Sequence, residues 1–243
     1  MFGRQKTAAL VAEFLGAGVL TLLVLSVQRS TIGVPFFVAI AAGLAVVLMG
    51  FAVGAISDGH FNPAITIGMW TARKVTTYRA VVYIAAQMLG GWAAYYVYTY
   101  FVHNSLQPVG GHFTGRIMVA EAVGTGIFAF AFASAAFQGY SRATKSAFVG
   151  LGFMIGIVAA SSASIGLLNP AVALGVRAFV WGTYVLGPVV GAIIGVNLYA
   201  ILFAEAGSSP WAAALESVSG GSSAAAVTTK STTKKKSAKK SKR

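Results

Sequence analysis

The chain has 243 residues, of which 57% are hydrophobic and only 9% are charged, and its mean hydropathy is +0.77. Soluble domains carry about 25% charged residues, so this composition excludes an ordinary soluble protein and indicates an integral membrane protein. The formal net charge is +13, and the lack of cysteine excludes disulfide bonds and thiolate sites for metal or redox chemistry.

Taken in chain order, six apolar stretches are long enough to cross a bilayer, which requires about 20 residues of helix. The first stretch is longer than the core of a signal peptide and no small-residue cleavage pattern follows it, so we expect it to remain in the protein. The predicted spans are residues 8–27, 34–56, 80–102, 117–137, 147–166 and 183–204.

One tripeptide occurs twice, as Asn62-Pro63-Ala64 after the second span and as Asn169-Pro170-Ala171 after the fifth. Asparagine caps helix N-termini well, and proline is favoured at the first helical position. Each copy therefore predicts a helix of about ten residues, which is about 15 Å long and half the thickness of a hydrocarbon core. We expect two re-entrant half-helices that meet inside the membrane.

Further residues repeat between the two halves of the chain. Val11-Ala12-Glu13 corresponds to Val119-Ala120-Glu121 at an offset of 108, and the two tripeptides are 107 positions apart. Because each half holds three spans, the second half must be inverted relative to the first, as in many channels and transporters. We therefore expect an all-α membrane domain over residues 1–207, with repeats at about 8–102 and 117–205.

The distribution of basic residues predicts the orientation. With the N-terminus in the cytoplasm, seven basic residues lie inside and three lie outside, which favours this orientation. Residues 208–243 are rich in Ser, Ala and Thr, end with eight basic residues, and are predicted to form a disordered cytoplasmic tail. Either the tail is simply solvated or it binds anionic lipid headgroups; we expect no nucleic acid partner.

Two acidic residues, Glu13 and Glu121, lie deep in predicted spans, where a charge costs about 2.5–3.5 kcal/mol unless it is hydrogen-bonded. They either brace the loops or act as proton-relay groups of a transporter. His60 precedes the first tripeptide and is either a pH sensor or a histidine bonded within its loop. The three histidines have no metal-ligand spacing. Rows of small residues, such as Gly50 and Gly54, predict close helix packing.

The paired tripeptides, the Ala12-Glu13-Phe14 segment, Glu121 and the Gly187-Pro188 segment of the sixth span resemble the aquaporin, or major intrinsic protein, family. The resemblance implies the six-span aquaporin fold, a homotetramer, no cofactor, no metal and no catalysis. It implies that Asn62 and Asn169 donate hydrogen bonds to the solute and that Glu13 and Glu121 brace the loops. The backbone carbonyls expected to line the pore are those of Gly59, His60, Phe61, Gly166, Leu167 and Leu168.

The same resemblance places the selectivity filter at Ala42, Ile157, Gly166 and Val172. Water-selective members have bulky aromatic or histidine side chains and an arginine there, so this filter is atypical. Ala42 and Gly166 are expected to leave room, while the Ile and Val resemble the plant tonoplast subgroup. The prediction is a passive channel for water and small neutral solutes such as hydrogen peroxide, ammonia, urea or glycerol. The alternatives are a coupled secondary transporter and a low-permeability structural or junctional protein.

Overall fold

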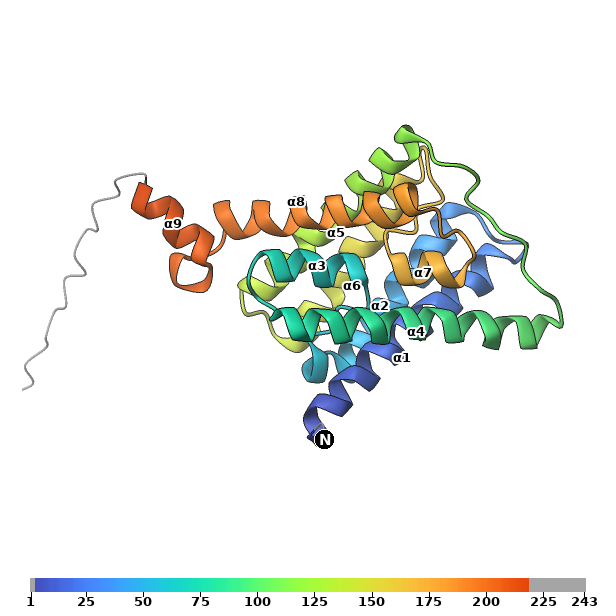
Figure 1. Ribbon diagram of the computed structural model, residues 1–243, viewed down its shortest axis with the longest axis horizontal. Helices are drawn as coiled ribbons and strands as arrows, with labels where there is room; N and C mark the ends of the chain where they lie inside the picture. The colour runs from blue at the N-terminus through green and yellow to red at the C-terminus, as the bar shows by residue number, and fades with distance from the viewer. Residues whose placement is uncertain (1–2, 219–243) are drawn as a thin grey trace, which may run out of the picture.

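The computed structural model describes residues 3–218 of the chain (Figure 1). It contains six helices that are long and apolar enough to cross a membrane, as the composition predicted. They are α1 (Arg4–Gln28), α2 (Pro35–Ser57), α4 (Thr77–Val102), α5 (Gly115–Phe137), α6 (Arg142–Ala160) and a sixth span in which a π-helical turn (Trp181–Leu186) leads into α8 (Gly187–Leu202). The predicted all-α architecture is therefore confirmed.

Two short helices begin at the two Asn-Pro-Ala copies: α3 (Pro63–Thr71) and α7 (Pro170–Gly175). Figure 1 shows them in line between α4 and α8. They have nine and six residues, so both are shorter than the ten expected, and α7 clearly so. The difference between them arises at equivalent glycines, because α3 continues three residues beyond Gly68 whereas α7 ends at Gly175.

The fifth long helix differs from its predicted span of 147–166. Helix α6 starts at Arg142 and ends at Ala160, six residues before the predicted end. Three serines lie within the four residues that follow Ala160, and the chain continues as a loop. At the end of this loop, Leu167 and Leu168 donate their backbone N–H groups to Glu121 on α5 instead of continuing a helix. Gly166 and Leu168 in this loop have positive φ angles, which an α-helix does not permit.

Small residues allow close helix contacts. A Cβ atom added at Gly191 of α8 would lie 2.1 Å from the Ala122 carbonyl oxygen of α5, and one at Gly91 of α4 would lie 2.2 Å from that of Ala171 in α7. Gly50 packs in the same way against Ser146. Gly54 does not, since a Cβ there would have nothing within 4 Å, and this residue lines a cavity instead.

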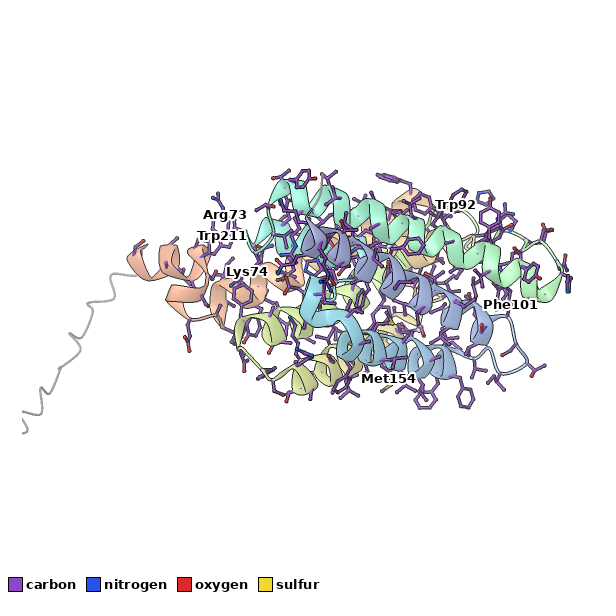
Figure 2. All side chains as sticks on the ribbon, turned by 90° about the horizontal axis from the view of Figure 1, so that it is seen from below. Arg73, Lys74, Trp92, Phe101, Met154 and Trp211 are labelled. Atoms are coloured by element: carbon purple, nitrogen blue, oxygen red, sulfur yellow. The ribbon has the colours of Figure 1, made fainter. Side chains whose placement is uncertain are left out.

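The segment predicted to be a disordered tail from residue 208 contains a further helix, α9 (Pro210–Val218). It is held against the end of α3, where the Trp211 indole nitrogen donates to the Thr71 carbonyl oxygen at 3.4 Å. The Arg73 guanidinium lies 5.3 Å from the centre of the Trp211 ring, and Figure 2 shows these two side chains together. The predicted basic segment at 230–243 lies outside the described residues.

The bundle exposes large apolar side chains and buries several polar ones within an apolar core. Large side chains such as Trp92 and Phe101 project outward from α4 (Figure 2), with 48% and 63% of their surface exposed. The central polar side chains include Glu13, Glu121 and Gln87, each fully buried. One end of the bundle, called the basic end below, is where α1, α4 and α6 begin; its basic residues are Arg4, Lys6, Arg73, Lys74, Arg79, Arg142 and Lys145.

Candidate functional site

The two asparagines cap the half-helices in the same way. The Asn62 Oδ1 atom accepts a hydrogen bond from the Ala64 backbone nitrogen at 2.8 Å, and the Asn169 Oδ1 atom accepts one from Ala171 at 2.9 Å. Proline occupies the first helical position in both, where its missing N–H group would have had no intrahelical partner. Both asparagines are buried, so the N-termini of α3 and α7 lie inside the bundle.

The side-chain amides join the two copies reciprocally. The Asn62 Nδ2 atom donates to the Leu168 carbonyl oxygen at 2.9 Å, and the Asn169 Nδ2 atom donates to the Phe61 carbonyl oxygen, also at 2.9 Å. Each asparagine therefore bonds to the residue that precedes the other one. This arrangement brings the N-termini of α3 and α7 together at the centre of the molecule.

Glu13 on α1 holds the loop that leads into α3. Its Oε1 atom accepts from the backbone nitrogen of His60 at 3.0 Å, and its Oε2 atom accepts from that of Phe61 at 2.7 Å. The Ser57 hydroxyl and the Gln87 amide add two further bonds, each of 2.6 Å. Four donors thus surround one buried carboxylate, as burial of a charge requires.

Glu121 on α5 holds the second loop by the equivalent contacts. Its two carboxylate oxygens accept from the backbone nitrogens of Leu167 at 3.0 Å and Leu168 at 2.7 Å. The Ser164 hydroxyl donates a third bond. Both glutamates are fully buried, and neutral groups supply all of these bonds.

The residue before each asparagine has a left-handed backbone. The φ angle is +50° at Phe61 and +54° at Leu168, and each such conformation costs a non-glycine residue about 1–3 kcal/mol. At both positions the backbone nitrogen donates to a glutamate and the carbonyl accepts from the opposite asparagine. These two bonds offset the strain and direct the peptide groups into the centre.

Three of these residues were not predicted from the sequence. Ser57 and Ser164 are 107 positions apart, the same offset as the two asparagines, so the repeat itself could have revealed them. Gln87 has no such partner, and a glutamine in an apolar span was its only signal. Its amide nitrogen donates to Glu13 and, at 2.9 Å, to the Thr66 hydroxyl, so the first half is more extensively bonded than the second.

His60 lies in the loop between α2 and α3 and is bonded within it. Its Nδ1 atom is 3.0 Å from the Thr66 hydroxyl, and its ring packs edge-on against Tyr83 and Phe132. Burial lowers the pKa of His60 to about 3; Asp58 opposes this effect, while Arg79 and Lys145 add to it. The histidine is therefore neutral at physiological pH, which favours the loop-bonded role over the pH sensor.

The four predicted filter residues belong to the buried interior. Ile157 and Gly166 are in contact, because a Cβ atom added at Gly166 would lie 3.1 Å from the Ile157 Cγ2 atom. The room expected at Gly166 is thus filled by isoleucine. Ala42 and Val172 lie in the same apolar cluster as Ile157, and all three have at most 1% of their surface exposed.

The predicted pore carbonyls lie in the two loops that lead to the asparagines. The carbonyls of Phe61 and Leu168 already accept the asparagine amides, and each oxygen keeps a second lone pair. Gly59 and Gly166, with φ angles of +70° and +66°, turn the two loops at equivalent positions. Within residues 3–218, no group of three or more His, Asp or Glu side chains could hold a metal ion.

The family model described as major intrinsic protein matches residues 4–199, which is most of the chain and includes both half-helices. The chain belongs to the major intrinsic protein family. Membership makes it a multi-pass membrane channel protein, in agreement with its six spanning helices.

Individual relatives agree with this assignment. The chain is 32% identical to aquaporin Z of Photorhabdus laumondii, over 81% of this chain and 97% of that protein. It is 34% identical to aquaporin AqpM of Methanothermobacter thermautotrophicus, over 72% and 77% of the two chains. It is also 29% identical to the glycerol uptake facilitator protein-like 6 of Lactiplantibacillus plantarum, over 76% of this chain and 93% of that protein.

Among solved structures, the aquaglyceroporin of Plasmodium falciparum superposes with a TM-score of 0.67. The match covers 80% of this chain and 95% of the aquaglyceroporin, at 21% sequence identity. At this identity the similarity establishes the shared fold of the major intrinsic proteins.

Proposed function

We propose that the chain is a passive channel for water and small uncharged solutes, which pass through the centre where α3 and α7 meet. The observation that carries the proposal is the reciprocal bonding of Asn62 to Leu168 and of Asn169 to Phe61. It brings two helix N-termini together, and each N-terminus carries about half a positive charge. Such a centre repels cations and attracts the oxygen of a water molecule.

The asparagine amides also suit a passing solute. A side-chain amide has two hydrogens, and in Asn62 and Asn169 one of them bonds to the carbonyl across the centre. The second hydrogen of each can donate to a solute oxygen. A water molecule held by two donors cannot accept a proton from its neighbour in the file, so the proton-conducting chain of waters is broken.

The filter supports a channel that admits solutes besides water. Val172 and Ile157 offer no hydrogen-bond donor where a water-selective pore would have polar side chains. Proton exclusion then depends on the half-helices and their asparagines. Hydrogen peroxide, ammonia, urea and glycerol are the solutes that we propose beside water.

The bonding of the glutamates argues against a coupled transporter. Such a transporter needs an ionisable or ion-coordinating group at the membrane centre. Glu13 and Glu121 are the acidic residues inside the spans, and both carboxylate oxygens of each already accept backbone hydrogen bonds. Flux that does not saturate and does not follow an ion gradient is the expected result.

A low-permeability protein of the same fold is the second candidate, and one observation favours it. Ala42, Ile157 and Val172 have almost no exposed surface, so the filter is tightly packed. Stopped-flow light scattering separates the two candidates. Proteoliposomes that shrink no faster than empty liposomes in an osmotic gradient would support the low-permeability protein and contradict the channel.

The same assay tests the filter when water, glycerol and urea are compared in wild type and Val172→Arg. We expect the arginine to reduce solute flux more than water flux, because it narrows the filter and adds a charged donor. Val34→Arg is the matched control, since Val34 caps α2 and is 50% exposed. Equal losses of water and solute flux in Val172→Arg would contradict the assignment of this position.

We also propose that the basic end faces the cytoplasm, since basic residues concentrate on the cytoplasmic side of membrane proteins. The C-terminal basic segment then lies on the same side, where anionic headgroups attract it by about 1 kcal/mol for each basic residue near the surface. Residues 1–207 are proposed as one channel domain. The homotetramer stays a prediction from the family resemblance.

A further inference from the structure

A cavity of about 220 Å³ opens at the basic end, between the end of α2 and the beginning of α6. A second cavity of about 130 Å³ shares Asp58, Phe132 and Lys145 with it and adds His60 and Lys74. We call the two cavities together the vestibule. Through His60, two residues before Asn62, the vestibule reaches the loop that leads into α3.

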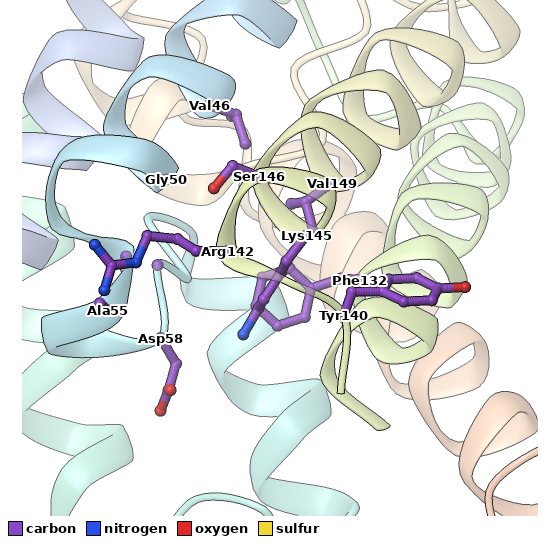
Figure 3. A pocket seen from close by; sticks show the side chains of 12 residues that line it. Val46, Gly50, Ala55, Asp58, Phe132, Tyr140, Arg142, Lys145, Ser146 and Val149 are labelled. Atoms are coloured by element: carbon purple, nitrogen blue, oxygen red, sulfur yellow. The ribbon is translucent and has the colours of Figure 1, made fainter. Parts of the chain in front are cut away.

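The charges around the vestibule are unbalanced. Lys74, Arg142 and Lys145 line it, against the single carboxylate of Asp58. That carboxylate is already engaged, because its Oδ2 atom accepts from the Arg79 guanidinium at 2.9 Å. Figure 3 shows Arg142, Lys145 and Asp58 around the larger cavity.

The three cations have no acidic partner in the part of the chain that the structure describes, in which Arg79 and Asp58 form the only ion pair. The Lys145 ammonium lies 5.8 Å from the centre of the Phe132 ring, and the Lys74 ammonium lies 4.3 Å from that of Phe137. Ring contacts hold the two lysines in place without neutralising them. Cations that line a concave wall of low dielectric constant concentrate anions between them.

We propose that the vestibule binds a phosphate group of a small anion, held by Lys145, Arg142 and Lys74. Lysine and arginine are the usual partners of phosphate, and the buried Ser146 beside Lys145 adds a hydroxyl to the lining. The Phe132 ring that Lys145 covers also packs on His60, 5.4 Å between ring centres. An anion bound there occupies the entrance to the first half-helix and reduces flux.

The source of the phosphate is a free anion rather than a lipid headgroup. The vestibule is bounded by α2, α3, α5, α6 and the segments on either side of α3, and its lining includes Gly59 of the loop before α3. A different groove, lined by Lys6, Leu10 and Val82, lies between α1 and α4. Lys6 therefore provides a matched control, as a lysine at the same end of the bundle that does not line the vestibule.

Binding is tested by calorimetric titration of inorganic phosphate and pyrophosphate into the full-length protein in a neutral detergent at constant ionic strength. We expect saturable binding that Lys145→Met and Arg142→Gln each weaken about tenfold or more, the loss typical of one charged hydrogen bond. Lys6→Met should bind as wild type does, and Lys145→Arg should restore binding. The C-terminal lysines are common to all variants, so equal affinity in Lys145→Met and Lys6→Met would overturn the site.

The effect on flux rests on the proposed channel function and is measured separately, in proteoliposomes of phosphatidylcholine with pyrophosphate on both sides. We expect pyrophosphate to slow water flux in wild type and in Lys6→Met, and much less in Lys145→Met. If water flux is inhibited without pyrophosphate, and only when phosphatidylglycerol is added to the membrane, the ligand is a lipid headgroup and the proposal of a free anion is overturned. Binding without flux in any variant would refute the channel but keep the site, whereas flux without binding would refute the site alone.

Discussion

The most direct test of the central architecture is Glu121→Gln. Glutamine has the same shape as glutamate, but it replaces one carboxylate oxygen by an NH₂ group, which only donates. Glu121 accepts from the backbone nitrogens of Leu167 and Leu168 through different oxygens. The variant must therefore direct hydrogens at one of these two N–H groups and leave it without an acceptor.

The magnitude follows from these bonds. A buried N–H group without an acceptor costs about 1–3 kcal/mol, and the bonds that remain each lose about 1 kcal/mol with the charge. The free energy of unfolding should fall by about 2–5 kcal/mol. Because 1 kcal/mol shifts the unfolding midpoint of a chain of this size by about 2–4 °C, we expect a midpoint lower by about 5–15 °C.

The assay is thermal unfolding of the purified protein in detergent, followed by intrinsic fluorescence, together with water flux in proteoliposomes. Glu205→Gln is the matched control, since it makes the same chemical change at an exposed carboxylate after α8 and should alter stability by less than about 0.5 kcal/mol. If the midpoint of Glu121→Gln lies within about 2 °C of the control and its water flux is unchanged, the loop is not held by this carboxylate.

Three further predictions use these two assays or the recovery of monodisperse protein in size-exclusion chromatography. Because the folded pKa of His60 is about 3 and its unfolded pKa is about 6.5, water flux should not change between pH 8 and pH 5. The unfolding midpoint should fall as the pH drops from 6.5 toward 3, and His60→Phe should reduce that fall. Gly91→Val should prevent α7 from docking and abolish monodisperse protein, whereas Gly126→Ala should be tolerated, since its Cβ would lie 3.5 Å from the nearest atom. Gln87→Leu should lower the midpoint less than Glu121→Gln, because Glu13 keeps three of its four donors; an equal or larger loss would contradict the bond count.

The spans, the half-helices and the two buried carboxylates were predictable from the sequence. The length of an apolar stretch predicts a span, the capping chemistry of Asn-Pro-Ala predicts a helix start, and the cost of a charge in a membrane predicts that a buried carboxylate is hydrogen-bonded. Each of these properties can be read from a short segment of the sequence. The end of α6 was not predicted, although three serines lie within the four residues after Ala160. The loop that they begin is held by bonds from Leu167 and Leu168 to Glu121 on another helix, which no local pattern shows. The docking of α9 through Trp211 likewise depends on a distant residue, Thr71 at the end of α3.

The room expected at the filter shows the same limit. Glycine at 166 suggested open space, yet its φ of +66° is a backbone conformation that favours glycine, and a Cβ atom there would lie 3.1 Å from the Ile157 Cγ2 atom. In contrast, Gly54 was expected to pack against a helix and lines the vestibule. A small residue in the sequence therefore indicates either that a neighbouring helix or side chain packs closely against it or that it borders a cavity. Only the folded structure distinguishes these two cases.

The reciprocal asparagine bonds bear on the order of assembly during synthesis. The Asn62 amide has its acceptor at Leu168, so the first half-helix lacks that partner until more than a hundred further residues have entered the membrane. The first three spans can insert early, but their re-entrant segment reaches its final position only when the second repeat arrives. Closure of the centre is thus a late event that requires both repeats, and a membrane that holds only the first repeat contains no half-pore.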